Sequence, residues 1–265
     1  MKIKTAFSRF CRSISIYKTV LIVLLILLTS CFSDKDQKLN IATAANMQYA
    51  MHELSRSFTQ ETGIICETIV SSSGKLTAQI MEGAPFDIFV SADMRFPNEL
   101  FKHGFTSGEP KIYAYGKLVI WSINKNMNPD FVSFTNIKVK HIAIANPKTA
   151  PYGIVAFEVL NKKGIYDSIK NKLVFGESIA QTNQFITTYA AQIGITSKSS
   201  VLSPIMKNKG IWKEIEPDLY NPISQGIVII KDRNDQVELA ERFSDYLFSV
   251  KAREILEKHG YSVNK

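Results

Sequence analysis

Apolar runs typical of strands alternate with amphipathic stretches typical of helices from about residue 39 to the C-terminus. The stretch 47–62 shows helical spacing, with apolar residues at 47, 50, 51, 54 and 58 and a glycine where the pattern stops. Strands that alternate with helices predict an α/β fold, a parallel or mixed sheet with helices on both faces. The expected strands are 39–42, 64–70, 86–90, 117–124, 141–145, 173–175, 194–197 and 223–231. The expected helices are 47–62, 75–81, 96–102, 154–160, a stretch after 179, and one long helix over 235–258.

Two of the β-type runs, 117–124 and 223–231, are placed where the chain would cross between two lobes and return. About 230 residues of ordinary apolar content build either one large domain or two small lobes. The double crossing favours two lobes joined by two strands, with a ligand in the cleft between them. We therefore predict that 39–117 and 224–265 form lobe I and that 118–223 form lobe II.

The first thirty residues have the features of an export signal. A basic front without acidic residues precedes an apolar run over 20–28, which is shorter than a membrane-spanning helix. The run ends in 28–31 (LTSC), which resembles the lipobox of bacterial lipoproteins, where the cysteine is acylated and becomes the new N-terminus. We predict a lipoprotein signal peptide over 1–30, lipidation of Cys31 and a polar tether over 31–38. The alternative is an ordinary secretory signal, or an uncleaved anchor in which Cys31 is incidental.

This leader changes what the composition means. Five of the 32 basic residues lie in it, so 27 basic and 24 acidic residues remain and the formal charge falls from +8 to about +3. No basic run follows residue 38, so a nucleic-acid partner is not expected. Cys11 leaves with the signal and Cys31 carries lipid, which leaves Cys66 as a buried apolar residue without a disulfide partner.

Several strand-to-helix junctions carry small polar residues, above all 44–47 (AANM) and 71–76 (SSSGKL). The first turn of a helix leaves backbone N–H groups without acceptors and adds partial positive charge, so such junctions can hold an anion with neutral groups. Similar junctions occur at 149–153 and 176–179. The alternative is that Asn46 and Ser73 only cap their helices.

Four segments in this order resemble the periplasmic molybdate-binding proteins that serve ABC transporters: 44–46 (AAN), 71–76 (SSSGKL), 83–93 (GAPFDIFVSAD) and 146–153 (NPKTAPYG). The resemblance spans about 39–265 and implies a two-lobed type-II periplasmic binding protein, each lobe a mixed sheet flanked by helices. It also implies a monomeric, exported, membrane-anchored lipoprotein facing the periplasm or cell exterior. Such a protein is not an enzyme and needs no cofactor; it captures molybdate or tungstate for a permease and its ATPase.

The resemblance also assigns the ligand contacts, position by position. Asn46, beside Ala45, and Ser73 correspond to positions that bind through side chain and backbone. Tyr152 and Ile179 correspond to positions that bind through backbone N–H. Ser197 stands where some members carry a ligand-binding tyrosine; because serine is shorter, the phenol of Tyr152 is the alternative source of that contact.

Two other functions remain open from the sequence alone. The same architecture could bind another tetrahedral oxyanion such as sulfate, since the size of the cavity is not visible in the sequence. An exported enzyme acting on a phosphorylated substrate would need a nucleophile, base or metal in the cleft. The segment 71–76 lacks the first glycine and the final serine or threonine of a phosphate-binding loop, and no G-x-S-x-G elbow occurs.

Overall fold

The computed structural model describes residues 38–231 and 236–263. The predicted signal peptide, the lipidation at Cys31 and the tether up to residue 37 lie outside the described residues. Ten strands in the described part form two sheets of five strands each. No helix among the described residues combines the length and the apolarity needed to cross a membrane.

The first sheet is built from the two ends of the described chain. Its strand order is β2 (Ile65–Ser71), β1 (Lys38–Ala44), β3 (Ile88–Val90), β10 (Ile223–Ile229) and β4 (Lys111–Gly116). β1 runs parallel to β2 and β3, whereas β10 runs antiparallel to β3 and β4. The sheet is therefore mixed, with the parallel strands coming from the N-terminal half of the chain.

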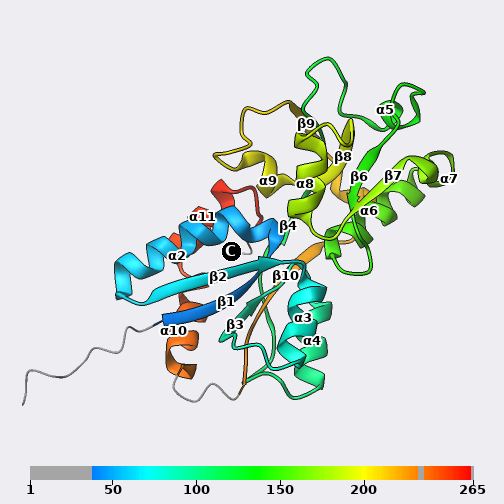
Figure 1. Cartoon of the computed structure of the whole chain (residues 1–265). Helices are drawn as coiled ribbons and strands as arrows, with labels where there is room; N and C mark the ends of the chain where they lie inside the picture. Colours follow the sequence, from blue (N-terminus) through cyan, green and yellow to red (C-terminus); the bar gives the residue numbers. More distant parts are fainter. Residues whose placement is uncertain (1–37, 232–235, 264–265) are drawn as a thin grey trace, which may run out of the picture. The chain divides into compact units, whose positions relative to one another are not determined.

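Helices cover both faces of the first sheet (Figure 1). On one face lie α2 (Gln48–Thr62), α10 (Val237–Leu247) and α11 (Val250–Lys258), and on the other α3 (Ser73–Met81) and α4 (Arg95–Lys102). Neighbouring strand residues point to opposite faces, so Ile41 packs with α2 whereas Ala42 packs with α3. A strand buried on both faces reads as a continuous apolar run, which is why β1 is visible in the sequence.

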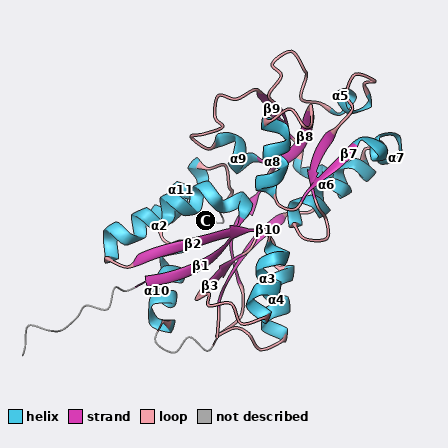
Figure 2. Cartoon of the chain, in the orientation of Figure 1, coloured by secondary structure: helices cyan, strands magenta, loops and turns pink. Residues whose placement is uncertain are grey.

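The second sheet comes from the middle of the chain (Figure 2). Its strand order is β7 (Leu173–Gly176), β6 (Ile142–Ala145), β8 (Ile193–Ser197), β5 (Leu118–Ser122) and β9 (Ile211–Glu214). β6 runs parallel to β7 and β8, whereas β5 runs antiparallel to β8 and β9. The helices with this sheet are α5 (Phe131–Thr135), α6 (Pro151–Lys162), α7 (Tyr166–Ile169), α8 (Ile179–Thr187) and α9 (Lys198–Leu202). Three short 3₁₀ turns complete the described elements: η1 (Ala45–Met47), η2 (Lys170–Lys172) and η3 (Pro217–Leu219).

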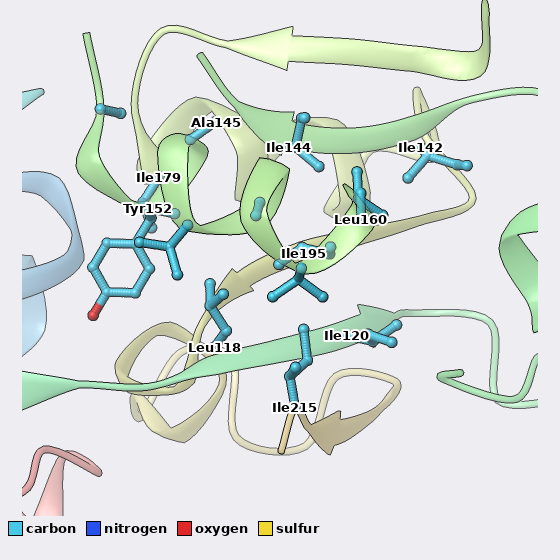
Figure 3. Packing of buried hydrophobic residues seen from close by; sticks show 14 of the residues in the cluster. Leu118, Ile120, Ile142, Ile144, Ala145, Tyr152, Leu160, Ile179, Ile195 and Ile215 are labelled. Carbon is cyan, nitrogen blue, oxygen red and sulfur yellow. The ribbon is translucent and has the colours of Figure 1, made fainter. Parts of the chain in front are cut away.

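One face of the second sheet packs against α6 in the largest apolar cluster of the described residues. Figure 3 shows Ile142 and Ile144 of β6, Ile120 of β5 and Leu160 of α6 converging in this cluster. The opposite face carries a smaller cluster around the fully buried Trp121. Helices on both faces of two mixed sheets confirm the predicted α/β class.

The chain passes between the two sheets at two places. Only Lys117 separates β4 from β5, and β10 returns the chain to the first sheet. The lobe limits 39–117, 224–265 and 118–223 stay a prediction.

Two local predictions differ from the structure. The single helix expected over 235–258 is two helices, because Ser249 stands in extended conformation and its Oγ accepts a hydrogen bond from the N–H of Ala252 at 3.2 Å, which starts a new helix. Cys66, expected to be buried, is only partly buried, and its desolvation raises the thiol pKa to about 11. The apolar pattern runs on through the helix break because both helices face the same core, with Phe243 before it and Leu256 after it.

Candidate functional site

A small cavity lies where the carboxyl ends of parallel strands in both sheets meet. η1 follows β1, α3 follows β2, α6 follows β6 and α8 follows β7, and all four junctions border the cavity. The carboxyl ends of parallel strands meet at one edge of a sheet, and ligands of open α/β folds bind there. The lining residues are Ala44, Ala45, Asn46, Ser72, Ser73, Ala92, Ala150, Pro151, Tyr152 and Ile179.

The cavity is small and lacks charge. Its volume is about 10 Å³, close to the least that holds one water molecule. None of its lining residues carries a charged side chain. Any ion held here must therefore be bound by neutral donors or acceptors.

Three helices begin at this cavity. Ser73 is the first residue of α3, Tyr152 the second of α6 and Ile179 the first of α8. N–H groups in a first turn have no acceptor inside their own helix, and within the described ranges no other acceptor is found for these three. The helix dipoles add partial positive charge at the same point. The cavity is therefore surrounded by unused N–H donors.

Two serine hydroxyls add to these donors. Ser73 Oγ accepts a hydrogen bond from the N–H of Ala92 at 3.0 Å, so its own proton remains available to donate. Ser72 Oγ is buried and has no hydrogen-bond partner among the described residues. Ser72 is the N-cap residue of α3, but its side chain makes no capping bond. The sequence analysis missed Ser72, because three adjacent serines do not reveal which of them reach the cavity.

Asn46 lines the cavity, but its side chain is engaged elsewhere. Its Nδ2 donates to Gln225 Oε1 at 2.7 Å and to the hydroxyl of Tyr261 at 2.9 Å. Gln225 Nε2 donates to the carbonyls of Ala92 and Ile223, which fixes the orientation of Gln225 and therefore that of the Asn46 amide. Both amide hydrogens are occupied, so the side-chain donation expected of Asn46 is absent in this arrangement. Its backbone N–H remains as the group it can offer.

Tyr152 and Ile179 reach the cavity at the starts of their helices, but the phenol of Tyr152 extends toward the crossover. A Cβ atom added to Gly116 would lie 2.0 Å from the Tyr152 hydroxyl oxygen, so the phenol rests against a residue without a side chain. Figure 3 shows the ring with its oxygen directed away from the labelled aliphatic residues. Burial raises the pKa of Tyr152 well above that of an exposed tyrosine, and the neighbouring tyrosines add to this effect.

Ser197 does not line the cavity. It is fully buried at the end of β8, where its Oγ lies 2.7 Å from Ser200 Oγ and 3.0 Å from Ser199 Oγ. The other five predicted site residues, Asn46, Ser73, Tyr152, Ile179 and Ala45, all line the cavity. The structure thus brings together five residues from four separate segments. Ser197 lies outside the lining and is linked to Asn46 through Ser199.

Lys75, two residues after Ser73 in α3, is already paired. Lys75 Nζ lies 3.2 Å from Glu177 Oε2, and both side chains are about half exposed. Hydrogen bonds from Asn146 and from Lys75 lower the pKa of Glu177. Lys75 therefore forms an exposed ion pair outside the cavity lining.

A larger groove, of about 1040 Å³, lies between α2 and α11, but its chemistry is different. Its charged side chains are of both signs and pair with one another: Lys258 and His259 contact Glu53. Among the described residues no group of three or more His, Cys, Asp and Glu could hold a metal ion. The small cavity is therefore the better candidate for a specific ligand.

Several known proteins are similar to this chain in sequence and in fold. The molybdate-binding protein of Azotobacter vinelandii is 38% identical over 228 residues, covering 85% of this chain and 90% of that protein. The molybdate-binding protein of Rhodobacter capsulatus is 37% identical over 221 residues, covering 83% of this chain and 86% of that protein. The solved structure of the Azotobacter vinelandii periplasmic molybdate-binding protein matches with a TM-score of 0.80 at 31% identity, covering 86% of this chain and 100% of that one.

The structural match confirms the predicted two-lobed type-II periplasmic-binding-protein fold. The sequence family described as bacterial extracellular solute-binding protein matches residues 39–262, nearly all of the chain after the predicted leader. Its members bind solutes outside the cytoplasm and are not enzymes, in agreement with the prediction that this chain has no catalytic role. The chain belongs to the family of bacterial extracellular solute-binding proteins.

Proposed function

We propose that this protein captures molybdate, and tungstate as well, in the small cavity and delivers it to the permease and ATPase of an ABC importer. The observation that carries the proposal is the convergence of three unused first-turn N–H groups and two serine hydroxyls on one uncharged cavity. The relatives named molybdate-binding proteins support the choice of ion.

Donors without acceptors favour an ion without protons. A fully deprotonated dianion such as molybdate offers only acceptors, so each N–H and O–H of the cavity finds a partner. Hydrogen phosphate would turn its own O–H toward another donor, and a buried polar group without a partner costs free energy. Neutral N–H and O–H donors of the protein therefore select an ion by its protonation state, which a buried arginine would not do.

Sulfate is the principal alternative ion. It is also a fully deprotonated tetrahedral dianion near neutral pH, so the donors alone do not reject it. Size must separate the two, because fixed donors that reach a larger ion leave a smaller one with long hydrogen bonds.

Thermal unfolding with a panel of anions tests the proposal. A ligand that binds only the folded protein stabilises it by roughly 2.7 kcal/mol when present at about a hundred times its Kd. Molybdate and tungstate should raise the melting temperature, whereas equimolar sulfate and phosphate should leave it unchanged. Equal shifts with molybdate and sulfate would mean that the cavity binds tetrahedral dianions in general. The absence of a shift with every oxyanion would contradict the proposed function.

We infer further that the mature protein is a monomer tethered to the membrane by lipid on Cys31. The basic front, the short apolar run and the lipobox-like 28–31 support this inference. The tether over 31–38 would then connect the lipid to β1, which begins at Lys38.

The lobe limits at 117/118 and 223/224 belong to the proposal of a ligand cleft, since a cleft between two lobes needs two passages of the chain.

A further inference from the structure

A buried hydrogen-bond network lies beside the cavity and includes residues from both ends of the chain. The hydroxyl of Tyr261 accepts from Asn46 Nδ2 at 2.9 Å. It lies within donating distance of the Asn46 carbonyl, at 2.9 Å, and of Ser199 Oγ, at 3.1 Å. Ser199 Oγ also donates to the Asn46 carbonyl at 2.8 Å. The Tyr261 hydroxyl therefore contacts both the side chain and the backbone carbonyl of Asn46, and the Ser199 hydroxyl contacts the carbonyl alone.

Tyr261 belongs structurally to the first sheet. The next residue, Ser262, pairs with Tyr115 of β4, with N–H to carbonyl distances of 2.7 and 2.9 Å in the two directions. The ring of Tyr261 packs in the same apolar cluster as α2 and α11. The end of the chain is thus fixed to β4, and the Tyr261 hydroxyl reaches Asn46 from there.

Ser199 belongs to the second sheet, in the helix that follows β8. From it the network continues through Ser197 to Ser200, which accepts from Asn183 Nδ2 at 2.9 Å. Asn183 lies in α8, whose first residue, Ile179, lines the cavity. Buried hydrogen bonds therefore connect Asn46, after a strand of the first sheet, with Asn183 in the helix whose first residue lines the cavity.

We propose that Tyr261 is a positioning residue of the oxyanion site, one that holds Asn46 in place and ties it to Ser199 when the two sheets close on the ion. This rests on the proposed function, because the site it serves is the molybdate cavity. With the cavity closed, the Asn46 carbonyl accepts from both hydroxyls. If the sheets separate, Ser199 withdraws and Asn46 keeps only the contacts of its own sheet. Tyr261 therefore adds hydrogen bonds to the closed form and slows release of the ion.

Phenylalanine cannot perform this task. The tyrosine hydroxyl has one proton and acceptor capacity, so it can receive from Asn46 Nδ2 while donating to the Asn46 carbonyl or to Ser199 Oγ. Its removal leaves one hydrogen of the Asn46 amide without an acceptor in buried surroundings. An unpaired buried N–H costs free energy, so the Asn46 amide is expected to rotate toward another acceptor. That rotation would shift the Asn46 backbone, which lines the cavity.

Tyr113 provides a matched control. It is buried in the same apolar cluster, on β4, yet its hydroxyl has no hydrogen-bond partner among the described residues. Tyr113→Phe and Tyr261→Phe remove the same atom from the same core. A difference between them in ligand binding reports the hydrogen bonds of Tyr261 and not the loss of a buried oxygen.

The test is titration calorimetry with molybdate, together with stopped-flow measurement of its dissociation rate. Tyr261→Phe should raise the Kd about ten-fold, equivalent to about 1.4 kcal/mol, mainly through faster dissociation. Tyr113→Phe should stay within about two-fold of the wild type. Ser199→Ala, which leaves the tyrosine in place, should also speed dissociation, and the double variant should lose less than the product of the two single effects because both act on Asn46.

Three results would overturn the inference. Equal Kd values for Tyr261→Phe and wild type would remove the positioning role, as would an equal loss in Tyr113→Phe. If Tyr261→Phe does not fold, an unchanged dissociation rate in Ser199→Ala takes the place of the first result. Failure of the proposed function is separable from these outcomes, because it appears in the wild type as an absence of molybdate binding.

Discussion

Hydroxyl protons, more than amide protons, are the side-chain donors available to an ion in this cavity. Ser73 has a free proton and Ser72 a free hydroxyl, whereas both amide hydrogens of Asn46 are bound to Gln225 and Tyr261. A hydrogen bond to a charged partner contributes roughly 1.5–3 kcal/mol, more than a bond between neutral groups. The two serines should therefore matter most among the side chains.

Ser73→Ala and Ser72→Ala should each weaken molybdate binding by about ten- to a hundred-fold, because each removes one donor to the ion. Titration calorimetry measures the change. Ser71→Ala is the control, since Ser71 ends β2 in the same serine run and is not a cavity-lining residue. A loss in Ser71→Ala as large as that in Ser72→Ala would mean that the hydroxyls act through the fold of the turn and not through the ion.

Sequence could identify the positions around the cavity but not the direction of each side chain. Asn46, Ser73, Tyr152 and Ile179 follow strands in a recognisable order, so their meeting was predictable from the resemblance. The orientation of Asn46 depends on a glutamine 179 residues away and a tyrosine 215 residues away. No local pattern contains such partners, so the engagement of the Asn46 amide by Gln225 and Tyr261 was not visible in the sequence.

At the scale of elements, the first crossover between the sheets requires a residue without a side chain. Gly116 is the last residue of β4, and only Lys117 separates it from β5, the first strand of the second sheet along the chain. The Tyr152 hydroxyl occupies the space that a Cβ atom at Gly116 would need, at a distance of 2.0 Å. The start of α6 and the end of β4 are therefore packed against each other through this one contact.

Gly116→Ala should lower the free energy of unfolding by about 1–3 kcal/mol, the usual cost of overpacking a buried position. Urea unfolding measures this loss. Adding Tyr152→Phe removes the hydroxyl that clashes, so the double variant should recover part of the stability. No recovery would show that the substitution disturbs the crossover backbone directly.

Central elements were easier to predict than peripheral ones. The apolar runs of β1, β6 and β8 and the helix α2, ended by Gly63 at φ 76°, all read clearly from the sequence. β4 and β9 were missed; each lies at the edge of its sheet, where exposed lysine side chains interrupt the apolar pattern. Edge strands face solvent and carry such polar residues to discourage further pairing, so their sequences look less like strands.

At the scale of the whole molecule, the crossover region contains buried tyrosines that cannot ionise easily. Burial raises the pKa values of Tyr113, Tyr152 and Tyr261, and neighbouring tyrosines raise those of Tyr113 and Tyr152 further. In the unfolded chain the same hydroxyls lose their protons near pH 10. Below that pH both states hold the protons, and above it only the folded state does.

The free energy of unfolding should therefore fall as the pH rises above about 10, by up to about 1.4 kcal/mol per pH unit for each such tyrosine. Urea unfolding at several alkaline pH values measures the slope. Tyr113→Phe should make the decline less steep, since it removes one group that the unfolded chain ionises. An unchanged slope in Tyr113→Phe would mean that Tyr113 becomes exposed before the protein unfolds.

A second prediction for the whole chain concerns the proposed lipid on Cys31. Cys31→Ala should leave the precursor unprocessed or release the protein from membranes, because the acylated residue is lost. Cell fractionation and mass spectrometry of the N-terminal peptide measure the outcome, with Cys66→Ala as the control for loss of a cysteine. A wild-type N-terminal peptide without lipid mass would contradict the prediction.

The lack of charged side chains around the cavity determines how protons and net charge change when the protein binds its ligand. No titratable carboxylate, lysine or histidine lies in the lining, so a dianion can enter without any proton being taken up or given off. Its binding enthalpy should then be the same in buffers of different ionisation enthalpy. The loaded protein also carries two more negative charges than the empty one, which isoelectric focusing can resolve.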